Sequence, residues 1–482
     1  MRLRALRGHG RGRQRLRATL IAAAVIGVAV LAGAVPAARA AAQPTIPGPV
    51  VGSGLTPLQR FVLDGKLAAR NKVTWHPRRT VPAVVAGLHD VPNLPAMADA
   101  SRSPARFRRT CGAPKPGHVA CLALLRTDIS GLQKVRLKPD DPPVTVPPGY
   151  GPASLWSAYN LPSTTDGAGQ TIAIVDAYDD PNAESDLAEY RAYYGLPSCT
   201  TANGCFLKTD EYGATDTLPD PDADWSTEIS LDLDMVSAIC PLCHIALIEA
   251  YSSDGSDLGT GVDTAVYAGI KYVSNSYGSE ESQDDLADDM YFDHPGAAIT
   301  VAAGDDGYEV NWPASSPYVT AVGGTSLLEA LDTRGWAEIA WTGTGSGCSQ
   351  IEPKPAWQTD TGCADRTVND VSAIADPSTG VSVYDTYDTE ALGFDPGFVD
   401  MGGTSAGAPI IASVYALAGT PAANTFPASY PYADPGGLND ITAGTNSPYE
   451  PCTPSYLCNA VPGYDGPTGL GTPDGVGAFE AP

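Results

Sequence analysis

Thr171–Tyr178, TIAIVDAY, is a run of apolar residues that carries one acid, Asp176. Similar short runs recur further along the chain, at Cys243–Tyr251, Tyr272–Gly278, Ala298–Asp305 and Tyr318–Gly324. Continuous apolar strands of this kind are typical of a parallel sheet that is covered on both faces. Helix-like segments fall between them, for example Trp225–Ile239 and Leu258–Ile270. The pattern predicts a doubly wound α/β domain, in which sites form at the carboxyl ends of the strands.

The chain of 482 residues divides into three parts by composition. Residues 1–41 join an Arg-rich start to an apolar stretch and a small-residue cleavage pattern, which predicts a signal peptide and a secreted protein. An uncleaved membrane anchor is the alternative interpretation. Residues 42–148 are rich in Pro and Arg and end in a Pro-dense segment, which predicts a linker between two domains. Residues 149–482 hold the predicted α/β domain.

Charge is divided unevenly between these parts. Residues 150–482 carry 49 Asp and Glu against 6 Lys and Arg, whereas residues 42–149 carry 15 Lys and Arg against 6 acids. The acidic domain repels nucleic acid phosphates and anionic membranes, so neither is expected as a partner after processing. Opposite charge predicts that the basic segment is held on the domain by electrostatic attraction. This electrostatic clamp should loosen as carboxylates become protonated in acid.

Ten cysteines fall into five pairs of sequence neighbours. The pairs are Cys111 with Cys121, Cys199 with Cys205, Cys240 with Cys243, Cys348 with Cys363, and Cys452 with Cys458. In an oxidising compartment this spacing predicts five local disulfides. The CPLC motif is also compatible with a redox-active pair or half of a zinc site, but the chain has no second CxxC.

A single serine, Ser405, lies among small residues in GGTSAGAP, at the mouth of an apolar helix-like segment. Small neighbours let a substrate backbone approach, and a helix N-terminus favours developing negative charge. Ser405 is therefore a candidate nucleophile. The alternative is that Thr404 or Ser405 caps the helix.

The proton acceptor for such a serine is predicted to be a carboxylate. Residues 150–482 contain only two histidines, His244 at the start of a predicted strand and His294 in a loop. Glu228 and Asp232 lie four residues apart on a predicted helix, on the face of its apolar stripe. Two carboxyls forced together in a buried place share a proton, which makes a general base from Glu. The alternative is a solvated acidic face.

Asp305 is the third candidate acid, because it ends an apolar strand next to glycines that permit close backbone approach. A protonated carboxyl there can donate a hydrogen bond to an oxyanion, which requires an acidic medium or a raised pKa.

Taken in order, these motifs resemble the sedolisin family of serine-carboxyl peptidases, which have a subtilisin-like fold and work in acid. The resemblance covers about residues 150–482 and rests on YGPASLWSAYNLP, WSTEISLDLD, SNSYG, AAGDDG, PASSPYVTAVGGTS, GGTSAGAP, NDITAG and GYDGPTGLGTPDG. It implies a mostly parallel sheet with helices on both faces, preceded by a short propeptide domain. The resemblance assigns that propeptide to the basic residues 42–148 and implies that it acts as an intramolecular inhibitor and chaperone. It also implies roles for named residues: Ser405 as nucleophile, Glu228 as general base, Asp232 as the acid that orients Glu228, Asp305 as oxyanion donor, and Ser276, Tyr277 and Gly278 as the strand that pairs with substrate.

The same resemblance implies one Ca²⁺ ion near the C-terminus. Its ligands would be the carboxylates of Asp440 and Asp465 and the backbone carbonyls of Ile441, Val461 and Gly463. Ligation by oxygen alone suits Ca²⁺ rather than zinc. The family usually has Gly at the position of Val461, and a Gly-rich surface turn is the alternative.

We therefore expect a secreted, monomeric, acid-active endopeptidase that cleaves polypeptides through a Ser405 acyl-enzyme. One alternative is a subtilisin-type peptidase that uses Asp176, His244 and Ser405. The other is a non-catalytic exported binding protein on the same fold.

Overall fold

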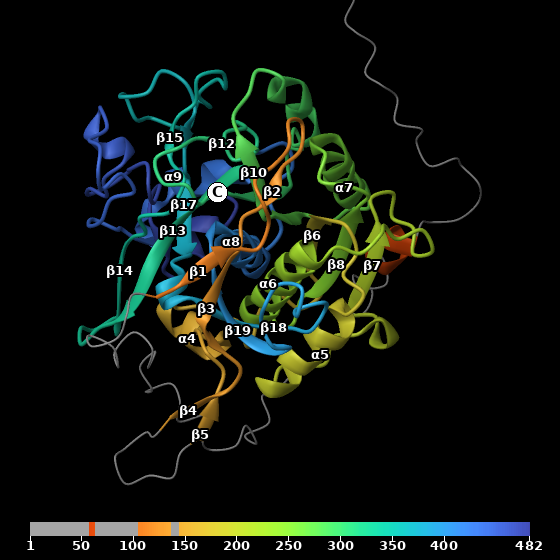
Figure 1. Ribbon diagram of the computed structural model, residues 1–482. Coiled ribbons are helices and arrows are strands. Elements are labelled where there is room, and N and C mark those ends of the chain that lie inside the picture. Colours follow the sequence, from red (N-terminus) through yellow and green to blue (C-terminus); the bar gives the residue numbers. More distant parts are fainter. Residues whose placement is uncertain (1–56, 63–104, 136–143) are drawn as a thin grey trace, which may run out of the picture. The chain divides into compact units, whose positions relative to one another are not determined.

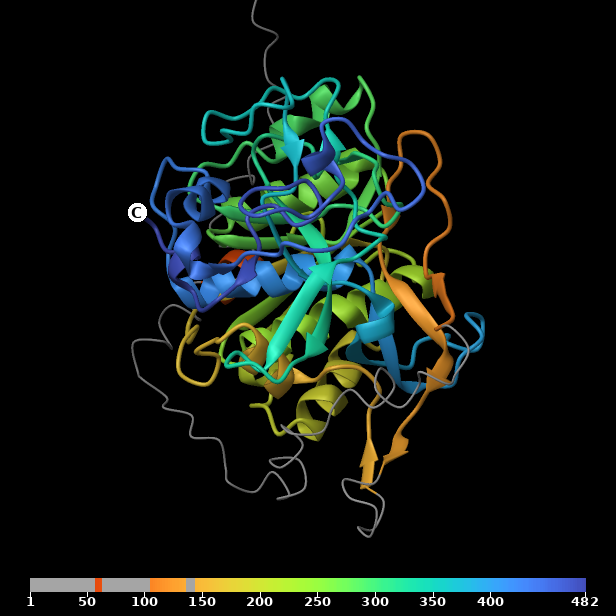
Figure 2. The ribbon, with the colours of Figure 1, turned by 90° about the vertical axis from the view of Figure 1, so that its left-hand side faces the viewer.

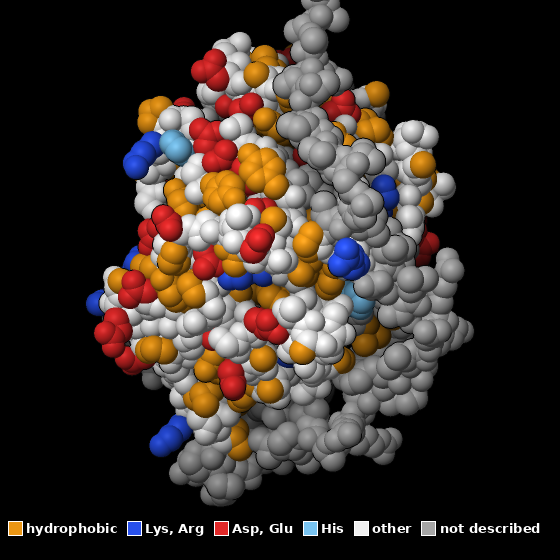
Figure 3. All heavy atoms as spheres, turned by 90° about the vertical axis from the view of Figure 1, so that its right-hand side faces the viewer, with side chains coloured by type: hydrophobic (Ala, Val, Ile, Leu, Met, Phe, Trp, Pro, Cys, Tyr) orange, Lys and Arg blue, Asp and Glu red, His pale blue; other side chains and the backbone are white. Residues whose placement is uncertain are grey.

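The computed structural model describes residues 57–62, 105–135 and 144–482, all within the unit Leu55–Pro482 (Figure 1). The signal peptide predicted over residues 1–41 lies outside the described residues, as does most of the predicted propeptide. Within the described residues, no helix has the length and apolar character needed to cross a bilayer. Acidic side chains are spread over the face in Figure 3, with few basic ones among them.

An eight-stranded sheet organises the unit, in the order β14-β13-β11-β9-β6-β8-β7 with β17 also paired to β13. Every pairing is parallel except β13 with β14. Its strands are β6 (Thr171–Ala177), β7 (Phe206–Asp210), β8 (His244–Ala250), β9 (Tyr272–Asn275), β11 (Ala298–Ala302), β13 (Thr320–Glu329), β14 (Trp336–Ala340) and β17 (Val371–Ile374). The strand order reverses between β6 and β9, which places a topological switch point there.

Helices cover both faces of this sheet. On one face α6 packs against α8, and on the other face α7 packs against β6 and β8. The strand side chains alternate accordingly: Ile174 joins the core that includes α6 and α8, and Val175 joins the core that includes α7. The helices are α4 (Pro152–Ala158), α5 (Ala183–Tyr193), α6 (Ala223–Ile239), α7 (Gly255–Tyr267), α8 (Thr404–Ala418) and α9 (Tyr430–Ala433). The predicted subtilisin-like α/β fold is confirmed.

One predicted strand is two in the structure. Tyr272–Gly278 is split at Ser276 into β9 and β10 (Tyr277–Glu280). The Ser276 hydroxyl donates to Asp232 on α6, which fixes the chain where it leaves the large sheet. From there β10 pairs with β12 (Asn311–Trp312) and with β2 (Ala120–Cys121).

A second sheet has the order β1-β3-β19-β18 and is antiparallel throughout. Its strands are β1 (Phe107–Arg109), β3 (Leu124–Ser130), β19 (Gly397–Gly402) and β18 (Val381–Asp385). The orange strands β1 and β3 lie along the blue β19 (Figures 1 and 2). Part of the segment predicted as a propeptide is thus paired with the strand that leads into α8. The remaining short pairs are β4 (Gln133–Val135) with β5 (Val144–Val146), β15 (Gly347–Cys348) with β16 (Thr367–Val368), and β20 (Leu438–Asn439) with β21 (Thr472–Pro473).

All five predicted disulfides are confirmed, and the CPLC motif forms one of them. The bridges join Cys111 to Cys121, Cys199 to Cys205, Cys240 to Cys243, Cys348 to Cys363, and Cys452 to Cys458. None of the ten cysteines, all of which the structure describes, is free. The longest separation in sequence is 15 residues, between Cys348 and Cys363, so each bridge fixes local structure rather than joining distant parts.

Candidate active site

The candidate site lies at the N-terminus of α8. Strand β19 ends at Gly402, and Gly403 connects it to the helix. Gly403 takes the N-cap position with φ of 96°, a left-handed value that favours glycine, and no side chain caps the helix. Ser405 is buried, and its hydroxyl donates to the backbone oxygen of Ser276 at 3.2 Å. The interpretation of Thr404 or Ser405 as a helix cap is therefore wrong.

Two acids of α6 reach the same place. Glu228 and Asp232 are both buried, so the interpretation as a solvated acidic face is also wrong. Asp232 accepts the Ser276 hydroxyl at 2.8 Å on each carboxylate oxygen. Ser276 therefore connects Asp232 to Ser405 through its side chain and its backbone.

Glu228 is an unusual buried acid, because neither of its oxygens has a hydrogen-bond partner among the described residues. Burial raises the pKa of Glu228 well above its usual range, and the nearby charge of Asp176 raises it further. The Ser405 hydroxyl and the backbone amide of Ala123 lie close enough to act in the opposite direction and lower that pKa. Catalytic hydrogen bonds are often long before the reacting complex forms, and this arrangement suits a general base beside a nucleophile.

Asp176 is the third member of this buried acid cluster. It lies at the carboxyl end of β6, and neither of its oxygens has a partner within the described part of the chain. Burial raises the pKa of Asp176 to about 8, and its charge also raises the pKa values of Glu228 and Asp232. From the sequence we considered Asp176 only in the alternative with His244. The sequence did contain a signal for this role. Asp176 lies near the carboxyl end of the central apolar strand, where sites form in sheets of this kind.

Asp305 follows β11 and contacts the first residue of α8, Thr404. Its Oδ1 accepts the Thr404 backbone N–H at 2.8 Å and the Thr404 hydroxyl at 2.9 Å. Its Oδ2 is buried without a partner among the described residues. Burial raises the pKa of Asp305 to about 7, so in acid this carboxyl is neutral and its free oxygen can carry a proton.

The three predicted substrate-binding residues lie between these groups. The Ser276 backbone oxygen accepts the Ser405 hydroxyl, and β10 pairs through Tyr277 and Gly278 with the extended segment β2. That pairing shows that this edge accepts an extended chain as an antiparallel strand. The segment that occupies it, around Leu122, was not foreseen from the sequence.

His244 is not part of this site. It starts β8 opposite Thr171, whereas Asp176 lies opposite Glu249. Five residues of strand separate the two positions, or about 16 Å at 3.3 Å per residue. Its ring packs against Phe61, and burial lowers the pKa of the imidazole. The arrangement excludes the alternative of a Ser405–His244–Asp176 triad.

The predicted calcium ligands lie in two segments near the C-terminus, residues 440–441 and residues 461–465, which are in contact through Asp440 and Gly463. Asp440 accepts the backbone N–H of Gly463 at 3.0 and 3.2 Å, and Asp465 accepts that of Val461 at 2.9 Å. Ile441 follows Asp440 directly. The donors offered are all oxygen, which fits Ca²⁺. Among the described residues, no group of three or more His, Cys, Asp or Glu side chains is arranged to hold a metal.

Comparison with known proteins agrees with this geometry. Residues 232–429 match the model of the subtilase family. The chain is 32% identical to kumamolisin of Bacillus sp. (strain MN-32) over 377 residues, which cover 70% of this chain and 64% of kumamolisin. It is 26% identical to sedolisin of Pseudomonas sp. (strain 101) over 377 residues, covering 68% of this chain and 60% of sedolisin. The chain thus spans less than two thirds of the length of these relatives.

A solved structure of Pseudomonas sedolisin, described as a serine-carboxyl proteinase complexed with two molecules of pseudo-iodotyrostatin, superposes with a TM-score of 0.57 and 25% identity. The match covers 68% of this chain and 96% of that structure. The fold and the serine beside buried acids resemble those of the subtilisin-like class of serine peptidases. Within that class, the chain is similar to kumamolisin and sedolisin in sequence and to sedolisin in structure.

Proposed function

We propose that this protein is a secreted, acid-active endopeptidase that cleaves polypeptides through an acyl-enzyme on Ser405. One observation carries the proposal: the Ser405 hydroxyl lies close enough to the buried acid Glu228 to lower its pKa, and the adjacent Thr404 holds Asp305, whose Oδ2 is buried without a partner among the described residues. The five disulfides are consistent with secretion, because such bridges persist in oxidising compartments.

Glu228 acts as the general base in this proposal. Three buried carboxyls cannot all be charged, so the proposed mechanism requires Asp232 and Asp176 to retain protons and Glu228 to carry the negative charge. The nearby Ser405 hydroxyl acts in that direction by lowering the pKa of Glu228, against the effect of burial. Glu228 takes the Ser405 proton as the oxygen attacks the scissile carbonyl, and then delivers it to the leaving amine. Water later attacks the ester with Glu228 again as base. Asp232 positions Ser276, whose backbone oxygen holds the Ser405 hydroxyl.

Asp305 stabilises the tetrahedral intermediate. Its neutral carboxyl donates a hydrogen bond from Oδ2 to the oxyanion, while Oδ1 stays fixed by Thr404. This role needs a protonated Asp305, so the rate should decline as the pH rises through about 7.

One Ca²⁺ ion is proposed at the C-terminal loop, held by Asp440 and Asp465 and by the backbone carbonyls of Ile441, Val461 and Gly463. The ion would fix this loop and takes no part in the chemistry. The two carboxylates face the same loop through their hydrogen bonds to Gly463 and Val461, which supports the assignment.

The test is a pH–rate profile on a peptide library, with the cut positions read by mass spectrometry. Ser405→Ala should lower kcat by on the order of 10⁶-fold, as loss of a catalytic serine does in subtilisin. Ser413→Ala is the matched control, because Ser413 lies on the same helix, is buried, and has a hydroxyl without a partner among the described residues. Equal rates of peptide hydrolysis for the Ser405→Ala and Ser413→Ala variants would refute the proposal. So would a maximum of the wild-type rate above pH 7.

A further inference from the structure

A stretch of the chain's own N-terminal part passes through the candidate active site in extended form. The Val119 backbone N–H donates to Ser253 at 2.8 Å, and Ala120 and Cys121 pair with Gly278 and Tyr277 of β10. The stretch therefore forms the edge strand β2 of the β12-β10-β2 sheet, with one further backbone hydrogen bond, to Ser253, outside that sheet. Strand addition of this kind is a common way for a protein to bind an extended peptide.

The next residue, Leu122, meets the reacting groups. Its backbone N–H donates to the Ser276 oxygen at 3.2 Å, the same atom that accepts the Ser405 hydroxyl at 3.2 Å. A methyl group added to Gly403 would lie 2.1 Å from the Leu122 oxygen and 2.7 Å from Asp305 Oδ2. The Leu122 carbonyl and the proposed oxyanion donor thus converge on one point beside Gly403.

On the other side of the same peptide bond, the Ala123 amide lies close enough to Glu228 to act on its carboxyl. The carbonyl of this bond faces the oxyanion donor, and its nitrogen faces the proposed base. A substrate bond must adopt the same orientation if the leaving amine is to receive its proton.

The Leu122 side chain is buried among small residues. It is 4% exposed and clusters with Ala302 and Ala408. Its Cδ1 lies 3.4 Å from the position that a Cβ would take on Gly278. The small neighbours Gly278, Ala302 and Ala408 thus accommodate a branched aliphatic side chain next to the reacting carbonyl.

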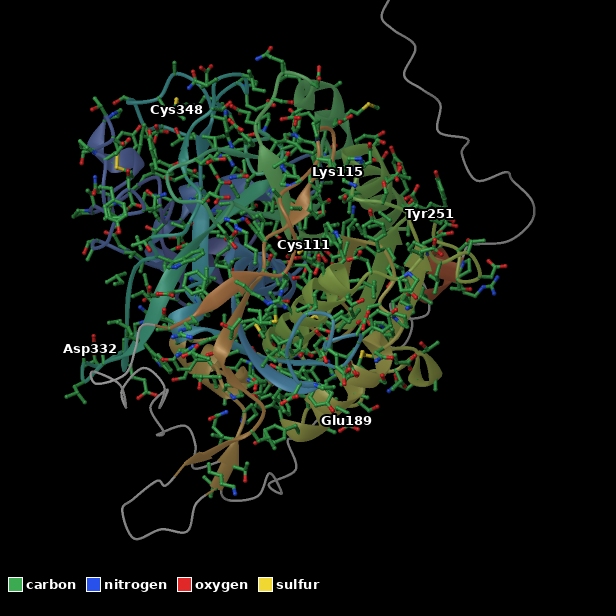
Figure 4. All side chains as sticks on the ribbon, viewed as in Figure 1. Cys111, Lys115, Glu189, Tyr251, Asp332 and Cys348 are labelled. Atoms are coloured by element: carbon green, nitrogen blue, oxygen red, sulfur yellow. A yellow bond between two sulfur atoms is a disulfide. The ribbon has the colours of Figure 1, made fainter. Side chains whose placement is uncertain are left out.

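One short stretch, which contains β1 and Cys111, is bonded to the chain on both sides of the Leu122–Ala123 bond. We call these contacts the clasp. Upstream of the bond, a disulfide joins Cys121 to Cys111 (Figure 4). Downstream, the Thr110 backbone N–H and hydroxyl donate to the Ala123 oxygen at 3.1 and 3.2 Å. Strand β1 then pairs with β3, which is itself paired with β19.

We infer that residues 105–130 form a built-in inhibitor that binds as a substrate, and that Leu122–Ala123 is the bond that the enzyme cuts in itself. The inference rests on the proposed peptidase function. The clasp keeps the two new ends together after the cut, so cleavage alone does not open the site.

In the cleavage step, Ser405 Oγ bonds to the Leu122 carbonyl carbon, the bond to the Ala123 nitrogen breaks, and that nitrogen takes the proton held by Glu228. The new amine stays beside the ester, because β3 remains paired with β19. It can attack the ester and restore the peptide bond in competition with water. Water that attacks instead yields a Leu122 carboxylate and a free Ala123 amine. Release then requires the upstream fragment to separate from β3, which the Cys111–Cys121 bridge opposes by fixing Cys121 to the β1 stretch.

The experiment uses the secreted full chain, incubated at pH 4 and sampled over time. Denaturing mass spectrometry should find a new amino terminus at Ala123, while gel filtration should find the upstream fragment still bound. In the double variant with Cys111→Ala and Cys121→Ala the fragment should dissociate, and peptide hydrolysis should appear, at least tenfold faster than in the wild type. The double variant with Cys199→Ala and Cys205→Ala is the matched control, because it removes another local bridge.

A new terminus elsewhere, for example within residues 136–149, would overturn the inference. So would equal release from the two cysteine variants, with folding of each verified by its melting temperature. These results leave the proposed function intact if peptide hydrolysis still depends on Ser405. Cleavage of the Ser405→Ala chain at the wild-type rate would instead refute the proposed function.

Discussion

Asp305→Ala should slow peptide hydrolysis about 10²- to 10³-fold, the usual cost of removing one oxyanion donor, or about 2.7–4 kcal/mol of transition-state stabilisation. The reason is that Oδ2 of Asp305 is buried and unpartnered among the described residues, so its proton is free to bind the intermediate. The loss should fall on kcat, because the interaction strengthens only as charge develops on the carbonyl oxygen.

The Asp305→Asn variant keeps a hydrogen-bond donor for the oxyanion but removes the group that ionises. The amide can keep its oxygen on the Thr404 donors and present an N–H where Oδ2 stood, so it should retain more activity than the alanine variant. Asp305 is neutral below about pH 7 and ionises above it, so the wild-type rate should fall above that pH. The asparagine side chain does not ionise, so the pH–rate profile of this variant should lack the fall above pH 7, its basic limb.

The assay is kcat and KM on a defined peptide from pH 3 to pH 9, using enzyme freed of its N-terminal fragment. Asp385→Asn is the matched control, because burial also raises the pKa of Asp385 to about 7 while its carboxylate contacts Thr227 instead of α8. An alanine variant within threefold of the wild type would refute the oxyanion role. An unchanged basic limb in the asparagine variant would refute the pKa assignment.

Three further outcomes are expected. Because burial raises the folded-state pKa of Asp176 to about 8, the stability from its proton is complete below about pH 4 and is lost as the pH rises through 8. Calorimetry should then find a melting temperature lower at pH 8.5 than at pH 4 by roughly 5 °C or more, and a rise would contradict this. Ca²⁺ at 100 times its Kd should stabilise the fold by about 2.7 kcal/mol, an effect that Asp465→Asn should abolish and that the exposed Asp474→Asn should leave unchanged. Release of the N-terminal fragment at fixed pH 4 should speed up severalfold between 0.05 and about 0.5 M salt, since screening weakens the Arg109–Asp306 pair and others like it, and salt-independent release would contradict the electrostatic clamp.

The fold was largely predictable because its signals are local. The apolar run of β6 is buried on both faces, as its pattern predicts. The two acids of α6 share the face of its apolar stripe, but the helix is buried on all sides from Trp225 to Ile239, which that stripe does not predict. Helix α7 starts earlier than predicted because Asp254 caps it by accepting the Ser256 backbone N–H, a local signal that apolar periodicity does not contain. Strand β13 continues past its predicted end because it pairs with β14 beyond the parallel sheet.

The rest of the site depends on contacts between distant parts of the chain. Leu122 lies in an ordinary short apolar stretch, and only its docking on β10 and Gly403 gives it a place at the site. The bend at Ser276 likewise depends on Asp232, which is 44 residues away in sequence. No pattern within a single segment contains that information.

The position of β3 has a practical consequence for producing this protein. A recombinant chain that began at residue 149 would lack both β1 and β3, and β19 would become an exposed edge strand directly before Ser405, the proposed nucleophile. Exposed edges promote aggregation, so such a truncated product should accumulate as insoluble material. Expression boundaries are better placed before residue 105, and a separately supplied polypeptide of residues 105–135 is the natural additive for refolding the shorter form.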